Sequence, residues 1–303
     1  MSTNTTLVMI NTFGLLFVIT NSLALGLRLH IGQILAHFFQ NWKLAVWVLL
    51  VNFVILPALI IGFAALVPIP SDIKIGYCIV ALAAGAPFAP ALTRLAKGNV
   101  DMSTSLFVVM VVVTVIAVPF VLPLAVSAVV PSVQHIAVWD VAWPLLVFVI
   151  IPLLIGCLIR LRYEEVAASW VRPLLIISIT GLLLYTNLFL YSDWNLFVNA
   201  WESGAYIAAF AVPILGIVFG SVISMKDVGT RHACAITTAQ RSITGAIILT
   251  IFNYTQPLAN VSVTIINSFG ILILLLLSME WGRRAQAHKG AVADTVVATE
   301  QVS

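Results

Sequence analysis

The most regular feature of the chain is a series of apolar runs, each about 20 residues long, separated by short polar stretches. A run of this length spans the hydrocarbon core of a bilayer when it forms an α-helix. A transmembrane β-barrel would instead show short segments of alternating hydrophobicity. The pattern predicts an all-α polytopic membrane protein with nine transmembrane helices, near residues 6–27, 43–66, 74–95, 102–128, 140–161, 168–190, 202–224, 231–252 and 258–281.

Two of the nine spans are interrupted at their centres. Span 74–95 contains Gly85, Pro87 and Pro90, and prolines at such positions remove backbone donors and disfavour a continuous helix. Span 231–252 contains the polar stretch TTAQRSITG, residues 237–245. Arg241 in this stretch lies about 15 Å along a helix from Arg231, which places its backbone at the bilayer midplane.

The spacing of the interrupted spans suggests an internal symmetry. They are five spans apart, so they cross the membrane in opposite directions, and each is the middle member of a triplet of spans. This arrangement is typical of an inverted repeat in which two broken helices cross at the midplane and form a binding site. Alternatively, the prolines only kink one helix and the hydroxyls bond back to their own backbone.

The basic residues indicate an orientation in the membrane. Positive residues favour cytoplasmic loops, and Lys74 alone falls on the opposite side from the others, while Arg241 lies inside. We therefore expect a multi-pass protein of the plasma (cell inner) membrane, with its N-terminus outside and its C-terminus in the cytoplasm. Residues 285–303 have no apolar face and are expected to form a disordered cytoplasmic tail. The twelve residues on the cytoplasmic side are Arg28, Lys43, Arg94, Lys97, Arg160, Arg162, Arg172, Lys226, Arg231, Arg283, Arg284 and Lys289.

Composition and motifs exclude several classes of function. The chain is 62% hydrophobic and 8% charged, whereas soluble domains have about 25% charged residues. Its net charge of +3 comes from loop residues and does not indicate a nucleic-acid surface. Cys78, Cys157 and Cys234 are isolated in apolar segments and are expected to be buried. HExxH, GxSxG and P-loop patterns are absent from the sequence, so we expect no enzyme activity, no metal site and no cofactor.

Several segments resemble the bile acid:sodium symporter family. They are NSLALGLRL (21–29), NFVILP (52–57), the segment 82–124 that begins LAAGAPFAP, and PLLIGCLIR (152–160). The resemblance covers nearly the whole membrane domain in order, residues 1–284. It implies a core domain of two inverted three-helix units, near 43–128 and 202–281, and a panel domain near 6–27 and 140–190. Members of the family move organic anions, usually with sodium.

The ion-site pattern of that family is largely missing from this sequence. Ala89 and Pro90 stand where the resemblance implies Ser and Asn, and Phe107 stands at the position of a threonine ligand. Thr238 replaces the acid of the second broken helix and Ser242 replaces a glutamine. The positions that keep a suitable side chain are Ser103, with a hydroxyl, and Asn52, with an amide.

The position of Arg241 carries the main hypothesis about the site. All eleven acidic residues lie in predicted loops, tails or span ends, so no carboxylate reaches the midplane. A sodium ion a few ångströms from the guanidinium would be repelled by about 4 kcal/mol at an effective dielectric of about 20. We expect Arg241 to replace the ion by bonding carbonyls at the helix break, or to receive an anionic substrate directly. The candidate substrate-binding residues are Arg241, Thr237, Thr238, Gln240, Ser242, Thr244, Pro87 and Asn267.

The sequence thus predicts a secondary transporter for a small organic anion that works by alternating access of the core against the panel. Its partners are the anion and the lipid bilayer, with no nucleic acid. The loss of the acid argues against sodium coupling of the usual kind. The alternative is a transport-inactive membrane protein of the same fold, which acts as a sensor or binds a partner.

Overall fold

The structure of the chain, a computed structural model, describes residues 3–29, 32, 40–133, 136–201, 204–224 and 227–300. Within these ranges the regular elements are all helical, as predicted. Lys226, Glu202 and the side chain of Lys289 lie outside the described residues. The elements are α1 Thr3–Arg28, α3 Trp42–Leu50, η1 Val51–Ile55, α4 Leu56–Leu66, α5 Ser71–Leu82, α6 Ala89–Leu95, α7 Val100–Val129, α8 Val138–Leu145, η2 Leu146–Ile150, α9 Ile151–Arg162, α10 Glu164–Ser192, α11 Trp194–Asn199, α12 Ala205–Ile223, α13 Val228–Ala239, α14 Ile243–Phe252 and α15 Pro257–Glu300.

Eight helices in the described part of the chain are long and apolar enough to cross a membrane, one fewer than the nine predicted. The predicted span 74–95 is missing from the eight because it is divided into α5 and α6, which have 12 and 7 residues. Many large apolar side chains point outward from the long helices, for example Val54, Ile116 and Leu183. Side chains of this kind form the lipid-facing surface of a membrane protein.

Two continuous helical rods widen into π-helical turns, η1 and η2. Each turn is followed by a proline, Pro57 or Pro152, at the same spacing. A proline has no N–H to donate to the carbonyl four residues earlier, and a π turn absorbs the mismatch without ending the helix. The turn η1 matters for the site because it contains Asn52.

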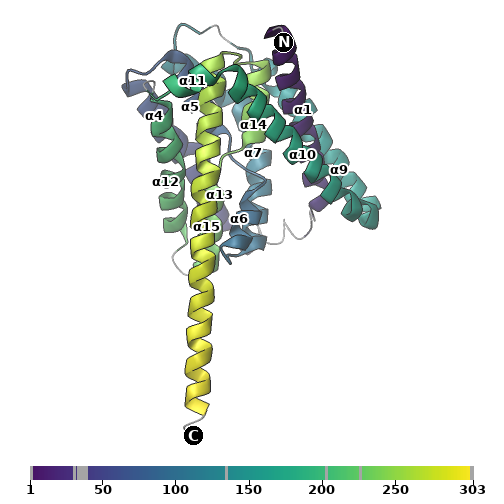
Figure 1. Cartoon of the computed structure of the whole chain (residues 1–303), viewed down its shortest axis with the longest axis vertical. Coiled ribbons are helices and arrows are strands. Elements are labelled where there is room, and N and C mark those ends of the chain that lie inside the picture. Colours follow the sequence, from purple (N-terminus) through teal and green to yellow (C-terminus); the bar gives the residue numbers. More distant parts are fainter. Residues whose placement is uncertain are drawn as a thin grey trace.

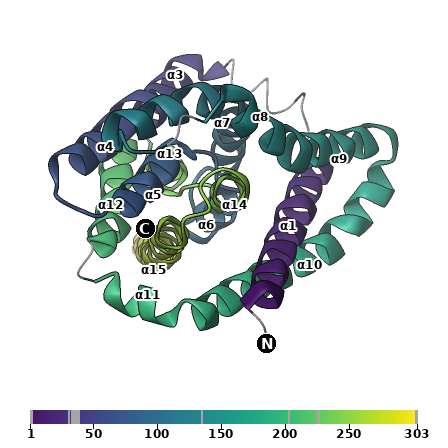
Figure 2. The same cartoon turned by 90° about the horizontal axis from the view of Figure 1, so that it is seen from above.

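The helices fall into two groups by packing. Helix α1 packs extensively against α9 and α10, and these three lie together at one side of the bundle (Figure 2). The close approach of α1 to α9 requires Gly26 and Gly156, because a Cβ added at either position would lie less than 2.5 Å from a carbonyl oxygen of the opposite helix. The other group contains α5, α7 and α12–α15. The assignment of a panel and a core domain, and their relative motion, stay predictions.

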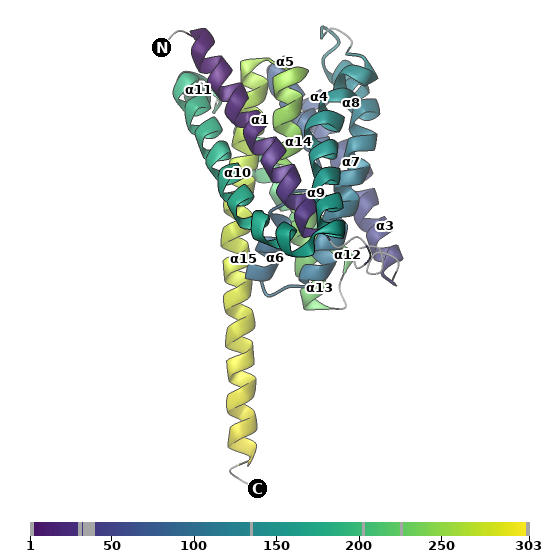
Figure 3. The ribbon, with the colours of Figure 1, turned by 90° about the vertical axis from the view of Figure 1, so that its right-hand side faces the viewer.

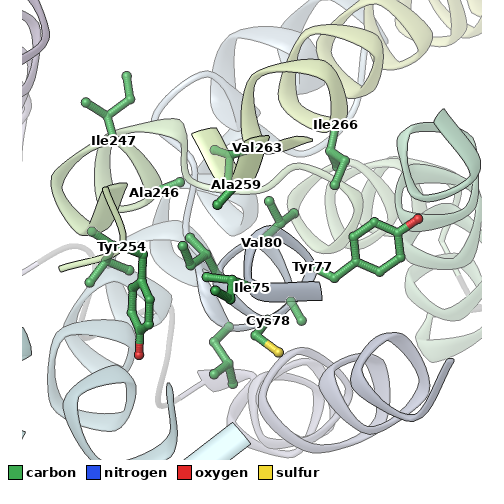
Figure 4. Packing of buried hydrophobic residues seen from close by; sticks show 14 of the residues in the cluster. Ile75, Tyr77, Cys78, Val80, Ala246, Ile247, Tyr254, Ala259, Val263 and Ile266 are labelled. Carbon is green, nitrogen blue, oxygen red and sulfur yellow. The ribbon is translucent and has the colours of Figure 1, made fainter. Parts of the chain in front are cut away.

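The largest apolar cluster joins the two groups, since it includes Phe17 of α1 and Tyr185 of α10 as well as residues of the second group. Figure 4 shows side chains of α5, α14 and α15 meeting there, among them Ile75, Val80, Ile247 and Val263. These residues are fully buried or nearly so. Dense apolar packing of this kind holds α5 and α14, one half of each interrupted helix, in fixed positions.

Helix α15 differs from the prediction at its C-terminal end. The sequence suggested a disordered tail from residue 285, whereas the helix continues to Glu300 and projects beyond the bundle (Figures 1 and 3). The segment after Trp281 contains no proline and is rich in alanine, a strong helix former. Glu280 also pairs with Arg284 at 2.6 Å, one turn along the helix, which supports its continuation.

Candidate functional site

Both predicted interruptions are present, and they meet inside the bundle. The first break separates α5 from α6 over residues 83–88, and the second separates α13 from α14 over residues 240–242. The backbone N–H of Ser242 donates to the carbonyl oxygen of Ala83 at 2.8 Å. Both residues are buried. This bond joins the two breaks directly and satisfies one donor and one acceptor that a helix break leaves free.

The first break depends on a glycine. Gly85 has φ +77°, and a Cβ at this position would lie 2.8 Å from the backbone nitrogen of Val111 in α7. Beside it, Thr114 of α7 donates its hydroxyl to the carbonyl oxygen of Ala84 at 3.0 Å. The unwound backbone therefore lies directly on α7, and only a residue without a side chain fits at position 85.

We expect Gly85→Ala to destabilise the fold by about 2 kcal/mol. The left-handed backbone conformation is unfavourable for alanine, and the added methyl group would clash with the backbone of Val111. The measurement is the thermal unfolding midpoint of the purified protein in detergent. A matched control is Gly62→Ala, since a Cβ at Gly62 meets nothing within 4 Å. An unfolding midpoint for Gly85→Ala at or above that of the wild type would contradict the assigned backbone conformation.

The two helices that flank the second break, α13 and α14, each begin with a side-chain cap. Asp227 begins α13, and its carboxylate accepts from the backbone N–H of Thr230 at 2.7 Å. This bond lowers the pKa of the Asp227 carboxyl below its ordinary value. Ser242 begins α14, and its hydroxyl accepts from the backbone N–H of Gly245 at 3.4 Å. Both caps are of the type that stabilises a helix N-terminus.

Arg241 lies in the second break with little compensation for its charge. It is 5% exposed. Its Nη1 donates to Oδ1 of Asn52 at 3.4 Å, while Nε and Nη2 have no hydrogen-bond partner in the described part of the chain. The ion pairs among the described residues do not include Arg241. The guanidinium thus bonds an amide of α3–α4 rather than carbonyls of the break, and two of its nitrogens are available to a ligand.

Asn52 connects Arg241 to α13 through hydrogen bonds to both Arg241 and Thr238. It is fully buried in η1. Its Nδ2 donates to the carbonyl oxygen of Val48 at 2.9 Å and to the hydroxyl of Thr238 at 3.2 Å. These two bonds fix the amide so that its oxygen faces Arg241. A π turn at such a position is common at functional sites.

A second polar group joins α6, α7 and α13 beside the crossing. Thr93 of α6 donates to Ser103 of α7 at 3.1 Å, and Ser103 is 2.9 Å from the hydroxyl of Thr237 in α13. All three side chains are fully buried. The chain of hydroxyls connects three helices, and each oxygen in it is already engaged in a hydrogen bond.

A small cavity adjoins Arg241. Its volume is about 10 Å³, and its lining includes Gln240, Asn267, Pro213 and Gly270. The Oε1 of Gln240 is buried without a partner in the described part of the chain, while Nδ2 of Asn267 donates to Val263 of its own helix at 3.0 Å. This volume holds about one water molecule. Binding of anything larger requires α12 and α15 to move apart.

The structure brings together many of the predicted site residues but not all of them. Thr244 lies away from the cavity and accepts from Nδ2 of Asn21 in α1 at 3.1 Å. Phe107 is buried in α7 and has no polar atom to offer. Ala89 and Pro90 form the first turn of α6, and Pro87 is half-buried in the first break. None of these last four supplies a side-chain hydrogen-bonding group.

Sequence reasoning missed several residues that shape the site. Asn21 is a buried amide in an apolar span, and its polarity there was the signal for it. Gly216 and Gly220 of α12 form a GxxxG pattern, which marks close helix contact in membranes. A Cβ at Gly216 would lie 2.3 Å from Cα of Ala239, the residue that ends α13. These glycines let α13 approach α12 and so determine where Gln240 and Arg241 lie.

The fold and the crossing define a class. A helical membrane protein in which two interrupted helices cross at a buried polar site has the architecture of a secondary transporter.

Comparison with known proteins identifies the family. The model of the Sodium Bile acid symporter family matches residues 12–200, more than half of the chain. An uncharacterized sodium-dependent transporter of Bacillus subtilis (strain 168), YocS, is 22% identical over 254 residues, which cover 82% of this chain and 76% of that protein. The chain belongs to the sodium bile acid symporter family, whose members are transporters and not enzymes. The resemblance expected from the sequence is confirmed.

Proposed function

We propose that the protein is a secondary transporter of a small organic anion and that Arg241 binds the anion's charged group. The observation that carries this proposal is the buried guanidinium with Nε and Nη2 unpartnered beside a cavity. A buried charge without a counter-charge is costly to fold. An anionic ligand would remove that cost whenever it is bound.

A carboxylate is the group that matches this site best. The guanidinium is a planar fork that can bond both oxygens of a carboxylate. At about 4 Å and an effective dielectric of about 20, the attraction is about 4 kcal/mol. Gln240 and Asn267 at the cavity wall offer further polar contacts. The substrate class we propose is therefore a small carboxylate, which enters when the cavity opens.

Alternating access requires one group of helices to move against the other. The contact between Asn21 of α1 and Thr244 of α14 lies on the boundary between the two groups. This polar bond is a contact that each transport cycle would break and re-form. We place the N-terminus outside and the C-terminus in the cytoplasm, because the basic residues at the ends of α1, α6 and α9 favour that side.

Coupling to sodium in the usual way of the family is not part of this proposal. YocS of Bacillus subtilis is described as sodium-dependent. In the present chain, Ala89, Pro90 and Phe107 supply no side-chain oxygen, and the hydroxyls of Thr238, Ser103 and Thr237 are engaged with protein partners. A fixed cation, Arg241, also occupies the crossing. This donor set does not fit a sodium ion, so we propose uniport, exchange or proton-linked transport.

The test is counterflow of labelled small carboxylates into proteoliposomes, with the sodium and proton gradients imposed separately. We expect counterflow without sodium and no stimulation by a sodium gradient. Uptake that requires sodium would contradict the proposed coupling while leaving anion transport intact. Absence of counterflow with every carboxylate, in a protein that still binds one in a thermal-shift assay, would favour the transport-inactive sensor.

A further inference from the structure

A basic cleft lies between the C-terminal end of α6 and the part of α15 around Gly282. Its volume is about 500 Å³. Arg94 and Lys97 line it from the α6 side, and Arg283 and Gln286 line it from α15. None of the ion pairs of the described residues includes Arg94 or Lys97, while Arg283 pairs with Glu280 at 2.8 Å. The cleft therefore keeps an excess of about two positive charges.

The walls of the cleft are held rigidly. A Cβ at Gly282 would lie 2.2 Å from the carbonyl oxygen of Leu95, so the backbones of the two helices approach closely at this point. Nearby, the ring of His232 stacks on Trp281 at 4.2 Å, and its Nδ1 lies 3.3 Å from the carbonyl oxygen of Ala96. Lys97 has φ +54°, in the left-handed region that ends the helix. The positions of the basic side chains are thus set by packing.

The lining changes character along the membrane normal. Helices α6 and α15 both run toward the end of the bundle from which α15 projects (Figure 1). About one turn before Arg94 and Arg283, the lining consists of Ala91 and Met279, and Leu95 lies next to Arg94; all three are exposed. Both walls are therefore apolar on the membrane side and basic on the aqueous side. A soluble anion would use only the basic part.

We propose that this cleft binds an anionic phospholipid, with its phosphate against Arg94, Lys97 and Arg283 and an acyl chain along Ala91, Leu95 and Met279. Phosphate is the natural partner of clustered Arg and Lys side chains, and basic recesses between membrane helices suit anionic head groups. The apolar half of the cleft selects a lipid over a free phosphate. This site is independent of the proposed transport function.

The test is native mass spectrometry of the detergent-purified protein titrated with phosphatidylglycerol or phosphatidylcholine. Each basic side chain near a membrane surface contributes about 1 kcal/mol toward anionic lipid. Replacing both Arg94 and Lys97 with glutamine should therefore weaken phosphatidylglycerol binding by about 30-fold. The matched control is Arg162→Gln, which removes an exposed charge at the end of α9 on the same side. It should leave the binding unchanged.

A second variant tests the apolar half of the cleft with all charges retained. Ala91→Phe should fill the lipid-side part and weaken phosphatidylglycerol binding, without lowering the thermal unfolding midpoint. Three results would overturn the proposal. They are equal binding of phosphatidylcholine, unchanged phosphatidylglycerol binding in the Arg94→Gln/Lys97→Gln variant, or full competition by millimolar inorganic phosphate.

Discussion

Replacing Arg241 with alanine should reduce carboxylate uptake about 100-fold at subsaturating substrate. Two charge-assisted hydrogen bonds to a carboxylate contribute about 3 kcal/mol together, which corresponds to about two orders of magnitude in binding. Arg241→Lys keeps the charge but loses the planar fork, so an intermediate loss of about 10-fold is expected. The measurement is the initial rate of counterflow in proteoliposomes for all three proteins. Arg162→Gln is the matched control for removal of a positive charge.

The stability of the same variants separates ligand binding from a structural role. Arg241 makes one long hydrogen bond, to Asn52 at 3.4 Å, and pairs with no described carboxylate. Removing such a charge should leave the protein as stable or make it more stable, because the burial cost disappears. Arg241→Met should therefore unfold at the same temperature as the wild type or higher. A large drop in the unfolding temperature would show that Arg241 stabilises the fold. The transport defect could then not be attributed to lost substrate binding.

The parts of the fold that the sequence predicted are those governed by local chemistry. Gly85, Pro87 and Pro90 together disfavour a continuous helix, and a guanidinium ten residues beyond Arg231 in an apolar span lies deep in the membrane. Both breaks are present where these residues stand. The count of nine spans is not confirmed: eight helices in the described ranges are long enough to cross, because the first break leaves α5 and α6 too short to cross alone.

The parts that were not predicted depend on long-range packing. Nothing in the neighbourhood of Asn21 indicates that its amide meets Thr244, which is 223 positions away. The sequence identified Asn52 as a position of the family's ion site that keeps an amide. Its role as the hydrogen-bond partner of Arg241 follows only from how α3–α4 pack against α13. The disordered tail was inferred from polarity alone, whereas the alanine content and the Glu280–Arg284 pair favour a continuing helix.

The second large effect should come from a single added methyl group on α12. Gly216→Ala places a Cβ 2.3 Å from Cα of Ala239 and 2.9 Å from its backbone nitrogen. Both contacts are with backbone, which cannot rotate away, so α12 and α13 must separate. We expect a loss of about 3 kcal/mol in stability, measured as the thermal unfolding midpoint in detergent. Because Ala239 directly precedes Gln240 and Arg241, carboxylate affinity should fall as well.

Gly62 of α4 provides the matched control for this substitution. The same Gly→Ala change meets nothing within 4 Å there, and alanine is favoured over glycine in a helix by about 1 kcal/mol. The two variants should therefore shift the unfolding midpoint in opposite directions, with Gly62→Ala unchanged in transport. If Gly216→Ala instead kept both stability and affinity, the close contact between α12 and α13 would not be what positions Arg241. The guanidinium would then owe its place at the crossing to Asn52 and the break itself.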